Sequence, residues 1–198
     1  MPFPVDLPTE IAANPWRLRL LSDVDWKLTW AMSRDPEVVR WTLYPPEMTE
    51  DAAHRRGRRI TQSTNKRLSG HYAVLDAEHA AIGTAGIASS DNDPAAAEVF
   101  YALLPQGRHR GAATAATRAL CEWAFSVGVE SVLLLTITGN AASEAVATRA
   151  GSIPDGEEMR DHQGSPTHMR RWARTGPNGV IAALPRSAGT HEPKRRAP

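Results

Sequence analysis

The chain has 198 residues, of which 41% are apolar and 23% charged, and its formal net charge is +1. These values fit one domain that is large enough to bury most of its apolar surface. A single cysteine, Cys121, excludes an internal disulfide framework and indicates a reducing compartment. Because no run of about 18 apolar residues and no signal-peptide pattern occur, we expect a cytoplasmic protein without a membrane span.

Hydrophobic periodicity predicts strands that alternate with helices along most of the chain. The predicted elements are, in chain order, a strand at 16–21, helices at 23–34 and 49–64, strands at 71–76, 81–89 and 96–104, a helix at 112–127, a strand at 131–138, a helix at 141–150 and strands at 152–158 and 167–173. Mixed strands with flanking helices predict an α/β sandwich. The helix residues at regular spacing that we expect to face the sheet are Ala113, Ala116, Leu120, Ala124 and Val127.

The domain organisation follows from composition. We assign residues 1–15 to an N-terminal extension and residues 16–174 to the domain. Residues 175–198 are basic and rich in proline and glycine, so we expect a flexible tail. Cys121 lies in the predicted helix at 112–127, where we expect a core residue rather than a nucleophile.

Residues 104–113, Leu-Pro-Gln-Gly-Arg-His-Arg-Gly-Ala-Ala, join an apolar strand to a helix. The first turn of a helix leaves backbone N–H groups without partners, and the helix dipole adds positive charge there. Glycine permits a tight turn and lets an anion approach the backbone closely. The segment therefore predicts a site for a pyrophosphate.

Two familiar phosphate-binding motifs do not fit this segment. A P-loop ends in Gly-Lys-Ser/Thr, whereas Gly111 is followed by Ala112 and Ala113. A dinucleotide fingerprint needs three glycines in G-x-G-x-x-G spacing, whereas the glycines here are Gly107 and Gly111. What remains is Arg-x-x-Gly-x-Ala, formed by Arg108, Gly111 and Ala113.

This pattern resembles the coenzyme A signature of the GNAT acetyltransferase superfamily, Gln/Arg-x-x-Gly-x-Gly/Ala. Residues 139–151, with a strand end, an asparagine, a short helix and a glycine, resemble the second hallmark of that family. Residues 16–23 resemble its opening strand and turn. Residues 35–41 resemble the link between its first two helices in the branch of ribosomal-protein-alanine N-acetyltransferases. The resemblance extends over residues 16–174.

The resemblance implies a fold and an activity. The fold is a mixed, mostly antiparallel sheet of about seven strands with flanking helices, whose fourth and fifth strands splay apart to admit the pantetheine arm. The activity is transfer of an acetyl group from acetyl-CoA, as co-substrate, to a primary amine by direct attack in a ternary complex. The implied coenzyme-binding residues are Tyr101, Leu103, Leu104, Arg108, His109, Arg110, Gly111, Ala112, Ala113, Asn140 and Ser143.

Three residues are candidates for the chemistry and its support. Asn140 suits a helix N-cap, and in the family the matching asparagine also contacts the pantetheine arm. Ser143 occupies a position that the ribosomal-protein branch uses to protonate or steady the thiolate; the alternative is an ordinary first-turn serine. Many other members use a tyrosine seven residues after the asparagine, and that position is Ala147 here.

Glu98 matches a glutamate of the branch and is the candidate base or cation site; the alternative is an edge charge. Phe100 replaces the usual glycine two residues later.

Several alternatives stay open at this level. The acceptor is a protein N-terminus or a small-molecule amine, and a homodimer is possible. The rival function is a non-catalytic acyl-CoA-binding or regulatory module.

The basic run His54–Arg59 is interpreted as a solvated helix face; the alternative is a site for an acidic acceptor or ribosomal RNA. Nucleic-acid association through Arg55–Arg59 and Lys194–Arg196 is the least favoured reading because the total charge is near neutral. The histidines lack metal-ligand spacing, so we predict no metal site.

Overall fold

The computed structural model describes residues 1–90, 93 and 95–177. Among these residues, eight strands form one sheet in the order β1–β2–β3–β4–β5–β6–β8–β7. The strands are β1 (Glu10–Ala13), β2 (Trp16–Leu20), β3 (Ser69–Leu75), β4 (Ala81–Ser89), β5 (Ala96–Leu103), β6 (Ser131–Ile137), β7 (Ile153–His162) and β8 (Ser165–Thr175). Neighbouring strands are antiparallel except for the parallel pair β5 and β6.

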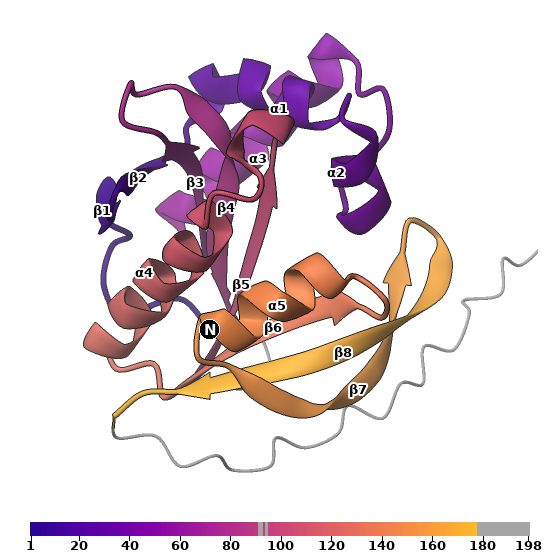
Figure 1. Cartoon of the computed structure of the whole chain (residues 1–198). Helices are drawn as coiled ribbons and strands as arrows, with labels where there is room; N and C mark the ends of the chain where they lie inside the picture. Colours follow the sequence, from indigo (N-terminus) through magenta and orange to yellow (C-terminus); the bar gives the residue numbers. More distant parts are fainter. Residues whose placement is uncertain (91–92, 94, 178–198) are drawn as a thin grey trace, which may run out of the picture.

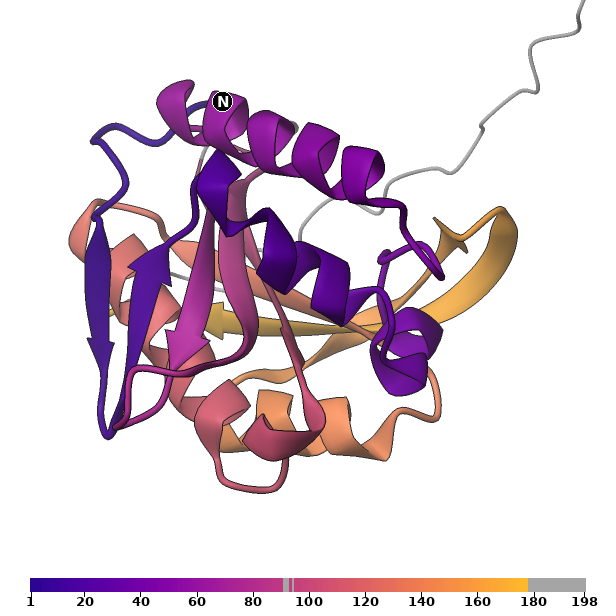
Figure 2. The same ribbon diagram turned by 90° about the horizontal axis from the view of Figure 1, so that it is seen from above.

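The helices cover both faces of the sheet (Figure 2). They are α1 (Trp26–Met32), α2 (Pro36–Trp41), α3 (Glu50–Asn65), α4 (Ala112–Ser126) and α5 (Ala141–Arg149), with short 3₁₀ turns at Asp23–Asp25 and Pro105–Gly107. Side chains at the N-caps fix where three of the helices begin, because each accepts a hydrogen bond from a backbone N–H of the first turn. These caps are Asp35 for α2, Thr49 for α3 and Asn140 for α5.

The helix α4 lies against one face of β1–β5 and forms the main core with it. Its buried residues are small or aliphatic, which keeps the helix close to the sheet: Ala112, Ala113, Ala116, Leu120, Cys121 and Ala124 are all buried. Four of the five residues predicted to face the sheet are therefore confirmed as buried, and Val127 packs against the core at its edge. Burial raises the pKa of the Cys121 thiol to about 11, which agrees with a core residue.

The parallel pair β5 and β6 separates part of the way along its length. The two strands pair in register only from Ala96 with Ser131 to Val99 with Leu134. Beyond that point β5 stays paired with β4, and β6 stays paired with β8. Figure 1 shows β5 rising toward α1 while β6 runs across the lower half of the molecule. The splayed central strands implied by the resemblance are present.

Two differences from the predicted elements concern the N-terminal third. The sheet has eight strands rather than about seven, because β1 pairs antiparallel with β2 inside the segment assigned to an extension. Residues 36–41 form the helix α2 rather than only a link, because Asp35 caps it and Pro36 occupies its first turn. The expected tail begins within β8, and its residues 178–198 lie outside the described part of the chain.

The first residues also contribute to the core. Phe3 is 3% exposed, and its ring meets Trp123 of α4 edge to face, with 5.1 Å between the ring centroids. The backbone N–H of Phe3 donates to the carbonyl of Arg67 at 2.8 Å. Leu7 is buried in the same cluster. The segment before β1 is therefore packed on the domain.

Replacing Phe3 by alanine should lower the free energy of unfolding by about 3–5 kcal/mol, because a buried aromatic ring is lost and a cavity remains. Chemical denaturation measures the effect. The matched control is Val5→Ala, since Val5 is 43% exposed and its loss should change stability by less than about 0.5 kcal/mol. Equal, small effects of both substitutions would show that residues 1–15 are a dispensable extension.

Candidate active site

The turn after β5 leads to backbone N–H groups at the start of α4 that no side chain caps. Gly111 is the N-cap of α4 in the left-handed conformation, with φ of 84°, and supplies no side chain to cap the helix. The first-turn N–H groups of Ala112 and Ala113 therefore keep no intrahelical partner. A Cβ built on Gly111 would meet only Trp16, at 3.5 Å, so the space above the turn is open. This geometry fits the pyrophosphate site that the sequence predicts. The backbone of Gly111, Ala112 and Ala113 is called the cradle below.

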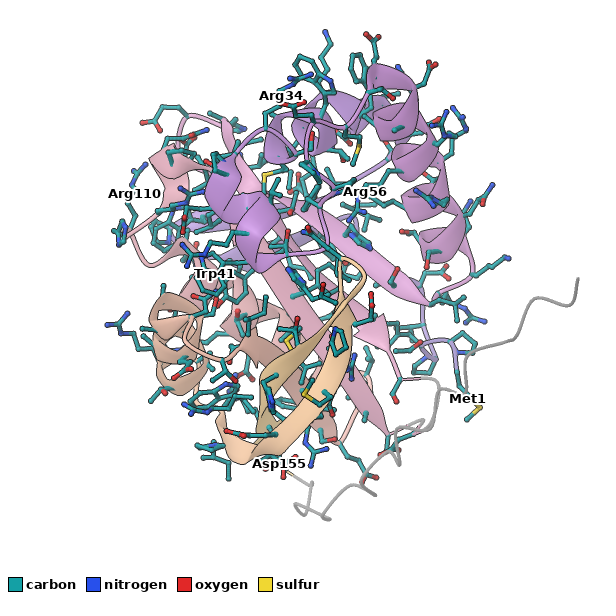
Figure 3. The ribbon with its side chains drawn as sticks, turned by 90° about the vertical axis from the view of Figure 1, so that its right-hand side faces the viewer. Met1, Arg34, Trp41, Arg56, Arg110 and Asp155 are labelled. Carbon is teal, nitrogen blue, oxygen red and sulfur yellow. The ribbon has the colours of Figure 1, made fainter. Side chains whose placement is uncertain are left out.

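The side chains around the cradle are divided between solvent and protein. His109 and Arg110 are exposed, and Figure 3 shows Arg110 at the outer edge of the molecule. The Arg108 guanidinium is instead turned toward the protein. Its Nε donates to the carbonyl of Leu103 at 3.0 Å, and its other end forms an ion pair with Asp35. Arg108 thus joins the cradle to the first turn of α2, a partnership the sequence did not indicate.

The edge of β5 that faces away from β4 presents backbone groups that no neighbouring strand pairs beyond Val99. The N–H of Leu104 donates to the carbonyl of Ile82 at 2.9 Å, so even-numbered positions of β5 bond to β4. Because hydrogen-bonding direction alternates along an antiparallel ladder, Tyr101 and Leu103 turn their N–H and C=O groups to the opposite edge. That edge has lost β6 as a partner beyond Val99. The predicted residues Tyr101 and Leu103 therefore line the opening with their main chain, and the carbonyl of Leu103 is the acceptor used by Arg108.

The N-terminus of α5 lies on the other side of this opening. The Asn140 side chain accepts from the N–H of Ser143 at 3.1 Å, so its role as an N-cap is confirmed. The Tyr101 hydroxyl reaches across from β5 to the Ser143 carbonyl, at 3.5 Å. Burial raises the pKa of Tyr101 to about 12, so the phenol stays protonated near neutral pH and can donate a hydrogen bond. The structure thus brings Tyr101, Asn140 and Ser143 together.

Glu98 projects from the opposite face of β5, because side chains alternate along a strand. This surface, the Glu98 face, carries Thr84 and Gly86 of β4 and Glu98, Phe100 and Ala102 of β5. The Phe100 ring lies over Gly86, where a Cβ would collide with it. The aromatic side chain in place of the usual glycine is therefore accommodated by a glycine on the neighbouring strand.

The Glu98 carboxylate has a long-range partner. Its Oε2 accepts from Nη1 of Arg160, on β7, at 3.2 Å, and Arg160 also pairs with Glu158. Burial raises the pKa of Glu98 above its usual value; Arg160 opposes the rise, and the negative charge of Glu158 adds to it. A carboxyl group whose pKa is moved upward suits a general base near neutral pH.

The hairpin of β7 and β8 closes the Glu98 face on the side of α2. The side-chain amide of Gln163, at the hairpin tip, donates to the carbonyls of Val39 at 2.7 Å and Thr42 at 2.9 Å. The His162 ring lies 3.2 Å from the carbonyl of Arg40. Val39 and Arg40 belong to α2, and Thr42 follows it. The hairpin tip therefore connects the β6–β8–β7 part of the sheet to α2. No sequence motif signalled this contact.

Two further findings concern other classes of site. Across the residues that the structure describes, no group of three His, Cys, Asp or Glu is placed to hold a metal ion. In the same part of the chain, no helix is both long and apolar enough to cross a membrane. Residues Lys194–Arg196, which entered the nucleic-acid reading, lie outside the described residues.

Comparison with known proteins gives a consistent result. The family model described as an acetyltransferase (GNAT) domain matches residues 16–153. No curated protein matches the sequence at a significant level. Among solved structures, the ribosomal-protein-S5-alanine acetyltransferase from Vibrio fischeri is 18% identical, with a TM-score of 0.74 over 87% of this chain and 100% of that one.

Two other solved structures share the fold. The microcin C7 self-immunity acetyltransferase, in complex with acetyl-CoA and AMP, is 14% identical, with a TM-score of 0.74 over 85% of this chain and 97% of that one. The spermidine N-acetyltransferase from Vibrio cholerae, in complex with CoA and spermine, is 14% identical, with a TM-score of 0.69 over 81% of this chain and 95% of that one. At these identities the likeness concerns the fold.

Replacing Arg160 by methionine should raise the pKa of Glu98 further, because the nearby positive charge and its hydrogen bond are what hold that pKa down. Carbon NMR of the carboxyl group during a pH titration measures the shift. Arg149→Met, an exposed arginine of α5, is the control and should leave the titration unchanged. An unchanged or lowered pKa in the Arg160 variant would contradict the described pairing.

Proposed function

Because the chain belongs to the GNAT acetyltransferase family, we propose that it transfers an acetyl group from acetyl-CoA to a primary amine. The observation that carries this proposal is the uncapped N-terminus of α4 beside the place where β5 leaves β6. The N-terminus of α4 suits a pyrophosphate, and the unpaired edge of β5 suits an amide-containing arm. Residues 101–113 connect the two features along the chain.

The residues proposed to hold acetyl-CoA act mainly through their main chain. The N–H groups of Gly111, Ala112 and Ala113 would bind the pyrophosphate, with the positive end of the α4 dipole behind them. The exposed Arg110 and His109 add charge and hydrogen-bond donors at the rim. The acetyl thioester supplies an activated acyl group, so the protein needs no covalent intermediate. It needs to position the amine against the thioester, deprotonate the amine and stabilise the departing thiolate.

Along the splay, main-chain groups of β5 would pair with the pantetheine arm. Tyr101 presents its N–H and C=O groups to the opening and Leu103 its N–H, since the Leu103 carbonyl accepts from Arg108. Leu104 begins the turn that leads to the cradle. The Asn140 side chain uses its oxygen as the cap of α5, which leaves its NH₂ group to donate to the same arm. Arg108 is proposed to hold the turn in place through Asp35 rather than to bind phosphate with its side chain.

The chemical step divides between the two faces of β5. Glu98 would take the proton from the ammonium form of the acceptor, directly or through one water, so that the neutral amine attacks the thioester carbonyl. On the other face of the strand, the Tyr101 hydroxyl reaches Ser143 at the start of α5. The hydroxyls of Tyr101 and Ser143 would donate hydrogen bonds to the departing thiolate. Tyr101 thereby supplies a phenol beside the α5 N-terminus, whereas position 147, later in α5, is alanine.

The acceptor is proposed to be a protein N-terminus or a small-molecule amine. Structures with the same fold include enzymes named for a ribosomal-protein alanine and for spermidine, which are acceptors of both kinds. The altered Phe100 and Ala147 positions also fit a module that binds acyl-CoA without turnover. Release of free thiol in the presence of an amine separates this alternative from the enzyme.

Gly111→Leu should weaken acetyl-CoA binding at least about tenfold, equal to about 1.4 kcal/mol, because a side chain would fill the open space above the cradle. Calorimetric titration with acetyl-CoA measures the dissociation constant. The control is Gly128→Leu at the other end of α4, where φ is 91° and the space is likewise open. Both variants carry similar backbone strain, so a loss of affinity in both would assign the effect to helix stability instead.

The acid limb of the pH–rate profile should report Glu98. Because the base works only when ionised, kcat/KM should fall as the pH drops through the raised pKa of Glu98. Glu98→Gln should remove this limb and lower the rate by about 100-fold, within the range of general base catalysis, as measured by thiol release. Glu157→Gln, at an exposed glutamate of β7, should leave the profile as it is. A persisting acid limb in Glu98→Gln would exclude Glu98 as the base.

A further inference from the structure

The basic run on α3 is not uniform in its surroundings. Arg55, Arg58 and Arg59 are exposed, as the solvated-face interpretation requires. Arg56 instead is half-buried and lies beside the buried residues of the helix, which are Ala53, Gly57 and Ile60. Figure 3 shows Arg56 on the side of α3 that faces the centre of the molecule. One arginine of the run is therefore turned toward the sheet.

Arg56 lacks an acidic partner in this position. Its guanidinium carbon lies 4.5 Å from the centroid of the Tyr44 ring, and its Nε atom is buried without a hydrogen-bond partner. Among residues 1–90, 93 and 95–177, no carboxylate lies within ion-pair distance of it. An arginine that is partly withdrawn from water without a counter-charge is costly, and an anionic ligand would offset that cost.

The neighbours of Arg56 place it at the Glu98 face. Burial lowers the pKa of His71 to about 4, with a smaller contribution from the charge of Arg56, so His71 is neutral at pH 7. The His71 ring contacts Phe100, with 4.8 Å between the ring centroids. Tyr44, beneath Arg56, has its hydroxyl 3.4 Å from Oγ1 of Thr84. Both contacts lead to residues of the face that carries Glu98.

The separation between the two charges follows from the strand register. His71 is opposite Gly86, which is opposite Phe100, two residues from Glu98. Thr84 is opposite Ala102, four residues from Glu98. At about 3.4 Å per residue, the strand positions beside Arg56 lie about 7–14 Å from Glu98 along β5.

We propose that Arg56 binds a carboxylate of the acceptor, so that the substrate class is an amine that also carries a carboxylate at some distance. This inference rests on the proposed function and specifies its acceptor. The guanidinium provides a single positive charge in a planar fork, which matches the charge and shape of a carboxylate. Because His71 is neutral, it adds no second charge beside Arg56, so the site suits a monoanion.

The test compares acceptors that differ only in the anion. With the protein saturated with CoA, calorimetry measures binding of 6-aminohexanoate and of 6-aminohexanamide. The wild-type protein should bind the carboxylate at least about tenfold more tightly, as expected for a charge-assisted hydrogen bond. A second pair of ligands, peptides that begin Ala-Glu or Ala-Gln, distinguishes a free amino acid from an acidic protein N-terminus as the source of the carboxylate.

Arg56→Met should abolish the preference for the carboxylate, and Arg56→Lys should keep part of it. Arg55→Met, on the exposed side of α3, is the matched control and should leave the preference intact. CoA affinity and thermal stability should not fall in Arg56→Met, because methionine fills the same half-buried position without an unpaired charge. Equal binding within both pairs of ligands, no binding of either carboxylate, or a preference that survives Arg56→Met would overturn the proposal.

The outcomes also separate this inference from the function on which it rests. Acetylation of the carboxylate and amide acceptors at equal rates would refute the carboxylate site and leave the acetyltransferase intact. A carboxylate preference in binding that depends on Arg56, without thiol release for any amine, would refute the enzymatic function and leave the anion site intact.

Discussion

The structure depends on the end of one hydrogen-bonded ladder. The strands β5 and β6 pair over Ala96–Val99 and then follow different partners, β4 and β8. A sheet interior normally satisfies every main-chain group, so an interrupted ladder leaves donors and acceptors that a ligand can use. Here the interruption leads directly into the uncapped first turn of α4, and the N-terminus of α5 faces it. The edges of the proposed coenzyme site are thus set by backbone geometry more than by side chains.

Successive side chains of β5 point to opposite faces of the sheet, so its residues contribute to the proposed reaction from two faces. Tyr101 points toward α5, where hydrogen bonding to the thiolate is proposed, while Glu98 points to the face where Arg160 and His71 lie. Because both residues belong to one short strand, the proposed hydrogen-bond donor and the proposed base keep a fixed spacing. Arg108 pairs with Asp35 at the start of α2, and Gln163 donates to carbonyls at the end of α2, so the surroundings of β5 are connected on both sides. These contacts hold the Glu98 face in relation to the cradle.

Much of this arrangement follows from local sequence, and the remainder depends on distant pairs. The cradle at Gly111 and the cap at Asn140 are local features, since each involves residues within one turn of a helix. Arg108 and Asp35 are 73 positions apart, and Arg160 and Glu98 are 62 apart, so no spacing rule connects them. The inward turn of Arg56 was available from the helical period that it shares with Ala53 and Ile60, but its lack of a partner required the tertiary structure. The sequence did not predict β1, because a strand of four residues is too short to show a clear hydrophobic alternation.

The central claim is that the cradle and the splay form one site for acetyl-CoA. Thermal unfolding of the wild-type protein with saturating acetyl-CoA, with ATP as the control anion, tests it most directly. A ligand at 100 times its dissociation constant stabilises by about 2.7 kcal/mol, and the melting temperature should rise by about 5–10 °C with acetyl-CoA. ATP, which lacks the pantetheine arm, should give little change. Unchanged melting at millimolar acetyl-CoA, or an equal shift with ATP, would contradict the account.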